Sequence, residues 1–91
     1  MSKFLAVLMP IVELLNRKNS DYGNSYYDLR DKYGDVAFRV RVADKLGRLD
    51  TLCQKPAQVN DESRLDTIRD MLGYCILELV YLEEQGEDIN G

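Results

Sequence analysis

With 91 residues, of which 45% are hydrophobic and 31% are charged, the chain has the size of one domain and too much apolar content to remain disordered. The formal net charge of −4 excludes general binding to a nucleic acid polymer, while a local group of Arg and Lys could still hold a small anion. Without histidine or a C-x-x-C pattern, a zinc site and a Cys/His nucleophile are excluded, and Cys53 and Cys75 are expected to be reduced, buried thiols of a cytoplasmic protein.

An apolar run over about residues 2–18 predicts a first helix at the centre of the fold. The run contains Pro10 and an acid and is too short to cross a bilayer, so no membrane association is expected. The stretch "NSDYGN" that follows predicts a loop. Ser25 could cap a short helix, which Gly34 could close.

Two longer helices complete an expected all-α fold. One covers "VAFRVRVADKLGRLDTLC" after an N-cap at Asp35, and the other covers about residues 61–84 and ends at Gly86. The expected core stripe of the last helix consists of Leu65, Ile68, Leu72, Cys75 and Leu79. Residues 1–85 should form a single compact helical bundle, with 86–91 as a flexible C-terminal tail. A core of this size stabilises a chain only marginally, so a homo-oligomer of at least two copies is expected.

Three acids of the last helix, Glu62, Asp66 and Asp70, lie one turn apart outside the core stripe. Such a line is often only a solvated surface. The same face continues as Gly73 and Leu77, however, so another helix should cover it and the acids should point to the edge of a cleft. Mg²⁺ or basic side chains would relieve the repulsion between the carboxylates. The line therefore predicts a ligand site, with a structural ion-pair network as the alternative.

Basic and polar side chains could supply the rest of such a site. Arg41, Lys45 and Arg48 share one arc of their helix, where they could neutralise phosphates or merely pair with acids on an exposed surface. The loop after the first helix offers a cation, amides, a carboxylate and an aromatic ring, which suit a nucleotide, although an Asx turn explains the same residues. The predicted ligand-binding set is Lys18, Asn19, Asp21, Tyr22, Asn24, Arg41, Lys45, Arg48 and Tyr74.

Three stretches resemble, in order and spacing, the nucleotide modification associated domain 1 family, which is frequent in phages and prophages. They are "KNSDYGNSYYD", "RVADKLGRLDTL" and "VNDESRLDTIRDMLGY", and the resemblance extends from about Lys18 to Leu82. The family is similar to the MazG-like all-α nucleoside triphosphate pyrophosphohydrolases. These enzymes are dimers or tetramers that hold Mg²⁺ with an E-x-x-E pair and an E-x-x-D pair. The resemblance therefore implies a phage or prophage protein of the bacterial cytoplasm.

The resemblance also implies roles for the acidic line. Glu62, Asp66 and Asp70 would be the catalytic and Mg²⁺-binding residues, with Thr67 where a further acid is expected, while "ELLN" keeps one acid of the other pair. Metal-assisted attack of water would then release pyrophosphate from a nucleoside triphosphate. Two alternatives remain open. The chain could hold a host immune signalling nucleotide intact as an anti-defence sponge, without a cofactor, or it could be a purely structural oligomer.

Overall fold

The computed structural model describes the backbone of residues 2–22, 25–55 and 57–86, and the side chains of these residues except 19–22 and 57–61. This part of the chain contains four helices and no strand, which confirms the all-α prediction. The helices are α1 (Lys3–Tyr22), α2 (Ser25–Tyr33), α3 (Val36–Leu52) and α4 (Ala57–Glu84). Of the expected tail, all but Gly86 lies outside the described residues.

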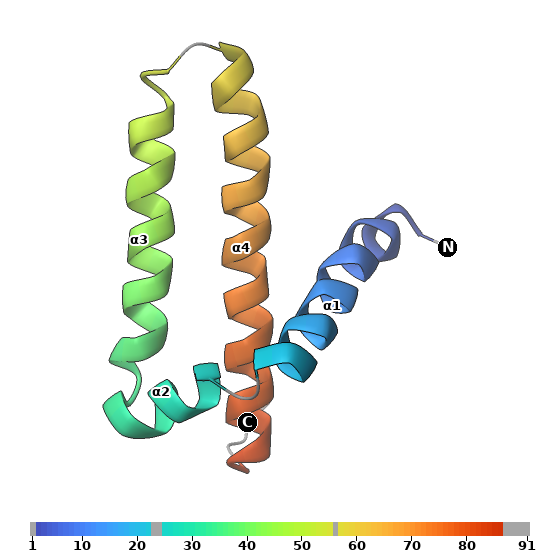
Figure 1. Cartoon of the computed structure of the whole chain (residues 1–91), viewed down its shortest axis with the longest axis vertical. Coiled ribbons are helices and arrows are strands. Elements are labelled where there is room, and N and C mark those ends of the chain that lie inside the picture. Colours follow the sequence, from blue (N-terminus) through green and yellow to red (C-terminus); the bar gives the residue numbers. More distant parts are fainter. Residues whose placement is uncertain (1, 23–24, 56, 87–91) are drawn as a thin grey trace.

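Helices α3 and α4 form an antiparallel hairpin, which is the largest packed unit of the fold (Figure 1). The short α2 lies across the open end of this hairpin, near the start of α3 and the C-terminal part of α4. Helix α1 packs on α4 near its own C-terminal end and then diverges, so that its N-terminus stands away from the hairpin. The space between α1 and the hairpin is therefore open at one end.

The two glycines predicted to end helices do so. Gly34 and Gly86 both have a φ of 76°, a left-handed conformation that carries little steric penalty without a Cβ. The amide of Gly34 donates to the carbonyl of Arg30 at 2.9 Å, and that of Gly86 donates to the carbonyl of Glu83 at 3.0 Å. These hydrogen bonds satisfy carbonyl groups that the helix ends would otherwise leave unpaired.

Asp35 is the N-cap residue of α3, but its side chain makes no capping hydrogen bond, contrary to the prediction. Its φ and ψ of −56° and −27° are helical, whereas a capping side chain needs an extended backbone to reach the first free amides. The carboxylate instead accepts a hydrogen bond from Arg39 Nε at 2.7 Å, one helical turn further along.

Two predicted helix boundaries are wrong in the same direction. Helix α1 continues to Tyr22, so the first four residues of the predicted "NSDYGN" loop are helical. Helix α4 begins at Ala57 instead of near residue 61. Polar residues such as Asn, Ser and Asp each disfavour a helix by less than about 1 kcal/mol, and once a helix is nucleated each added residue gains a backbone hydrogen bond.

The predicted core positions are largely exposed in the single chain. Within the described residues the buried apolar side chains are Ile11, Tyr26 and Leu52. The stripe of α4 formed by Leu65, Ile68, Leu72 and Leu79, called the α4 stripe below, is between 37% and 53% exposed. Helix α1, expected at the centre, has Phe4 and Val7 exposed by 77% and 66%, and Cys53 is exposed rather than buried. The four described helices therefore leave much of α1 and the outer face of α4 uncovered.

A buried carboxylate ties α2 to α4. Glu78 is 7% exposed and its Oε1 accepts a hydrogen bond from the Tyr26 hydroxyl at 2.7 Å. Arg30 forms a two-pronged ion pair with the same carboxylate, from Nε to Oε1 at 3.0 Å and from Nη2 to Oε2 at 3.1 Å. The guanidinium also lies over the ring of Tyr81, 4.5 Å from its centroid. We call Tyr26, Arg30 and Glu78 the Glu78 clamp.

Replacing Glu78 by Gln should destabilise the fold, because the side chain of Arg30, which is 12% exposed, would lose its countercharge. Breaking a buried ion pair in this way lowers the free energy of unfolding by about 3 kcal/mol. Urea unfolding followed by circular dichroism measures the change. Glu83→Gln, at an exposed position of the same helix, is the matched control and should change stability by less than about 0.5 kcal/mol. Equal losses in the two variants would contradict the role of the clamp.

Candidate functional site

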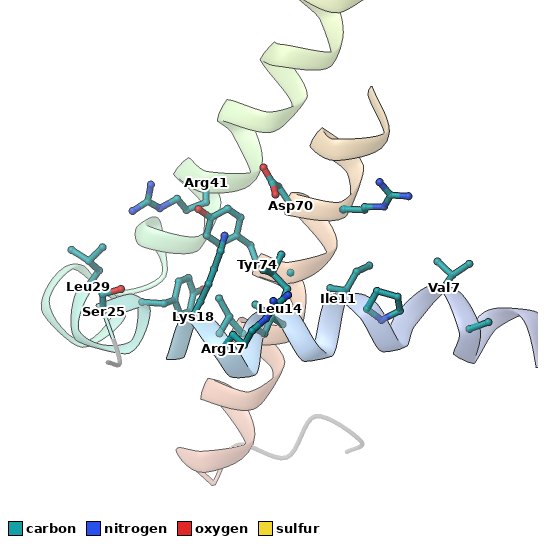
Figure 2. A pocket seen from close by; sticks show the side chains of 17 residues that line it. Val7, Ile11, Leu14, Arg17, Lys18, Ser25, Leu29, Arg41, Asp70 and Tyr74 are labelled. Atoms are coloured by element: carbon teal, nitrogen blue, oxygen red, sulfur yellow. The ribbon is translucent and has the colours of Figure 1, made fainter. Parts of the chain in front are cut away.

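A cavity of about 730 Å³ lies between α1 and the α3–α4 hairpin, and all four helices contribute to its lining (Figure 2). This volume is within the range of about 300–1,000 Å³ that is typical of small-molecule sites. The lining consists of Ala6, Val7, Pro10, Ile11, Leu14, Leu15, Arg17, Lys18, Ser25, Tyr26, Leu29, Arg41, Arg69, Asp70, Gly73, Tyr74 and Leu77. We call this cavity the central pocket.

One wall of the central pocket is apolar. It is built mainly by the face of α1 that carries Val7, Ile11 and Leu14, and Leu29 and Leu77 extend it from α2 and α4. Helix α1 crosses α4 at the buried Gly73, where a β-carbon would stand 3.7 Å from Leu15 Cδ2. This crossing confirms the prediction that another helix covers the continuation of the acidic face. An apolar wall with a few placed polar groups is the usual composition of a ligand pocket.

The charged side chains of the central pocket are mostly basic. Among the described side chains, its lining contains four cations, from Arg17 and Lys18 of α1, Arg41 of α3 and Arg69 of α4, and one acid, Asp70. The chain as a whole has a net charge of −4, so the positive charge is concentrated at this place. A concave site lined by one sign of charge attracts ligands of the opposite sign. The central pocket is therefore suited to an anion.

Two tyrosines add aromatic surface to the central pocket. The rings of Tyr26 and Tyr74 lie 6.3 Å apart between centroids, and the guanidinium of Arg41 lies 5.7 Å from the centroid of Tyr74. Burial, followed by the hydrogen bond to Glu78, raises the pKa of Tyr26 above its ordinary value. Its hydroxyl thus remains a neutral donor in the clamp, while the ring of Tyr74 lies beside a pocket cation, Arg41.

The predicted basic arc of α3 meets the predicted acidic face of α4. Lys45 Nζ lies 3.3 Å from Asp70 Oδ2, and Arg48 Nε donates to Thr67 Oγ1 at 3.2 Å. With Arg41 over Tyr74, these contacts form three successive steps along the antiparallel hairpin. Lys45 and Arg48 do not line the central pocket, however, whereas Arg41 does. The arc thus joins the two helices at one end and faces the pocket at the other.

The three acids Glu62, Asp66 and Asp70 have different surroundings. Asp70 lines the central pocket, Asp66 is exposed and lies 3.6 Å from Arg69, and Glu62 is exposed. Among the residues that the structure describes, no three acidic or cysteine side chains gather closely enough to hold a metal ion. The assignment of the line to catalysis and to Mg²⁺ stays a prediction, without a ready ligand set in the described part of one chain.

The predicted ligand-binding residues around the end of α1 are only partly described. Lys18 lines the central pocket, as does Tyr74 of α4. Asn19, Asp21 and Tyr22 belong to the backbone of α1, but their side chains, and all of Asn24, lie outside the described residues.

Several residues of the site are not among those predicted from the sequence. Arg17, which precedes the predicted Lys18, lines the central pocket, and so does Arg69 of α4. It can do so because α1 approaches α4 from that side, which helix periodicity alone does not show. The Glu78 clamp was also missed. A single acid inside the apolar run "CILELVYL" was the available signal, because such an acid needs a buried partner.

Comparison with protein families finds one match, to the model described as nucleotide modification associated domain 1, over residues 18–82. This range includes α2, α3 and most of α4, with the pocket residues Lys18, Arg41, Arg69, Asp70 and Tyr74. It leaves out the apolar wall of α1. Comparisons with curated proteins and with solved structures find no match. No described helix is both long and apolar enough to cross a membrane.

The raised pKa of Tyr26 makes the stability of the fold depend on pH in the alkaline range. Because the folded state holds this phenol neutral above its ordinary pKa of 10.0, the unfolded chain ionises first as the pH rises. The contribution of the neutral Tyr26 phenol to the free energy of unfolding is complete below pH 10.0 and is lost progressively above it. Tyr26→Phe should therefore show a shallower loss of stability above that pH than the native chain. Urea unfolding across the range tests this, and Tyr33→Phe, at an exposed position, should keep the native slope.

Proposed function

Because the chain belongs to the nucleotide modification associated domain 1 family, we propose that the central pocket binds a nucleotide. The phosphates lie among Arg17, Lys18, Arg41 and Arg69, and the base or sugar lies against Tyr74 and the apolar wall. The observation that carries this proposal is the concentration of basic side chains in the central pocket of an acidic chain.

Phosphate binding is supported by the weak pairing of the pocket arginines with acidic side chains. Arg41 forms no ion pair with any described side chain, and its nearest aromatic contact is the ring of Tyr74. Arg69 is paired with Asp66, but both side chains are more than half exposed, at 59% and 78%. An exposed pair of this kind contributes only about 0–1 kcal/mol, so an incoming phosphate can replace Asp66 at little cost. Planar guanidinium groups bind phosphate oxygens through two parallel hydrogen bonds.

A ring-bearing ligand is supported by the other half of the central pocket. Free phosphate or another small anion would leave the apolar wall of Val7, Ile11 and Leu14 in contact with water. A base or sugar covers this wall and can stack on Tyr74 beside Arg41, an arrangement that combines aromatic and cation–π contact. The pocket thus matches a ligand with one anionic end and one flat, less polar end.

The proposal also includes two expectations from the sequence: that the chain is similar to the MazG-like pyrophosphohydrolases, and that it comes from a phage or prophage. A nucleotide bound in the central pocket could have one of two fates. Its phosphoanhydride could be cleaved, or the intact molecule could be retained, as in a sponge protein. The described acids favour retention, because only Asp70 lines the central pocket and it is already paired with Lys45. Retention of an intact nucleotide is therefore the preferred form of the proposal.

Replacing Arg41 by Ala should weaken nucleotide binding about tenfold or more, because the loss of a charge-assisted, two-pronged contact removes about 1.5–3 kcal/mol. Isothermal titration calorimetry with the common ribonucleoside triphosphates and monophosphates measures the change. Arg39→Ala is the matched control, since Arg39 is an exposed arginine of the same helix that pairs with Asp35 outside the pocket. Equal effects of the two variants would argue against the central pocket as the site.

We propose further that the chain works as an assembly of identical copies. A folded protein of 10.5 kDa exposes about 5,400 Å². This chain exposes 6900 Å². The excess of about 1,500 Å² is comparable to what one subunit buries in an obligate dimer. The α4 stripe supports the same conclusion, since at about 100° per residue it lies opposite the positions of α4 that meet α3.

Ile68→Glu should shift the chain from an oligomer to a monomer, because it places a charge in the middle of the α4 stripe. Size-exclusion chromatography with light scattering measures the molecular mass. Gln54→Glu adds the same charge at an exposed position between α3 and α4 and should leave the mass unchanged. A monomeric native chain at high micromolar concentration would contradict the proposed assembly.

A further inference from the structure

The resemblance to MazG-like enzymes implies magnesium as a cofactor. Whether Mg²⁺ fits the central pocket depends on the oxygen ligands that the pocket offers. Mg²⁺ needs near-octahedral oxygen ligands, usually one or two carboxylates together with water and phosphate oxygens. Among the side chains that the structure describes, Asp70 is the one carboxylate in the pocket lining, and Lys45 Nζ already lies 3.3 Å from its Oδ2. A metal ion at Asp70 would be repelled by this ammonium group or would have to displace it.

The remaining acids of the predicted ligand set do not supply a second carboxylate. Asp66 is directed to Arg69 and Glu62 is exposed, and neither lines the central pocket. Nearby on α4, Glu78 is fully engaged by Tyr26 and Arg30. The described acids therefore do not fit a magnesium site in the central pocket.

We propose that the central pocket takes its nucleotide in the metal-free form, with basic side chains in the place that Mg²⁺ occupies in metal-dependent sites. This inference rests on the proposed nucleotide site and specifies its ligand class: a ring-bearing molecule with two or more negative charges on its phosphates, such as a nucleoside diphosphate or triphosphate without bound metal. The ligand is held and released unchanged, so no covalent step is involved.

The charges of the central pocket are matched to such a ligand. Pairing with Lys45 balances the charge of Asp70, which leaves four cations and no unpaired acid among the described side chains of the lining. A nucleoside triphosphate coordinated to Mg²⁺ has lost part of its negative charge and presents fewer free oxygens. The attraction between this complex and the pocket cations is therefore weaker than that of the uncomplexed nucleotide.

Calorimetric titration of the full chain with ATP, once in EDTA and once in excess MgCl₂ at equal ionic strength, tests the inference. ATP should bind more tightly in EDTA than in excess magnesium, by about threefold or more. Equal affinity in the two conditions, or tighter binding with magnesium, would overturn the inference and leave the proposed nucleotide site standing. Absence of ATP binding in both conditions would overturn the proposed site, and the inference with it.

Asp70→Asn separates the two views of this carboxylate. If Asp70 only balances Lys45, the variant should bind ATP about threefold more tightly in EDTA, because the charge of Lys45, beside the pocket lining, is then no longer balanced. If Asp70 is a metal ligand, the variant should lose a magnesium-dependent gain in affinity, which would overturn the inference. Asp44→Asn is the matched control, since Asp44 is exposed on α3 and does not line the pocket. Release of pyrophosphate from ATP during the titration with magnesium would also count against metal-free retention.

Discussion

The carboxylate of Glu78 is the point on which the arrangement of the helices depends. It lies inside an otherwise apolar stretch of α4, and burying a charge there is unfavourable unless a countercharge and hydrogen bonds accompany it. Arg30 and Tyr26 of α2 provide both, and this requirement holds α2 across the end of the hairpin. Because Tyr26 also lines the central pocket, the same contact sets one of its walls.

The hairpin and the central pocket share their charged residues. Along the contact between α3 and α4, basic side chains of α3 face Thr67, Asp70 and Tyr74 in turn. The pair of Lys45 and Asp70 joins the helices, and it balances the charge of the one acid found among the described pocket residues. An acidic chain can in this way present a cavity with an excess of positive charge, which is the basis of the nucleotide proposal.

Much of the apolar surface of the chain lies on the outside of the helices and not in a core within the single chain. The α4 stripe and the N-terminal half of α1 are exposed, although their patterns are those of buried helix faces. A hydrophobic period shows that a face avoids water, but it does not show whether the same chain or another copy covers it. For this reason the periodicity of α4 was read correctly as a stripe, while its placement in the core of the single chain was wrong.

The sequence by itself determined the helical class, the glycine ends of α2 and α4, the family, and the side of α3 whose basic residues meet α4 at Asp70. These features depend on residues close in sequence or on ordered motifs, so local chemistry is sufficient to predict them. Only the tertiary structure decided which of the charged residues line a cavity. Arg17 and Arg69 joined Lys18 and Arg41, whereas Lys45 and Arg48 did not, because the angle at which α1 leaves α4 determines which side chains meet across the open space.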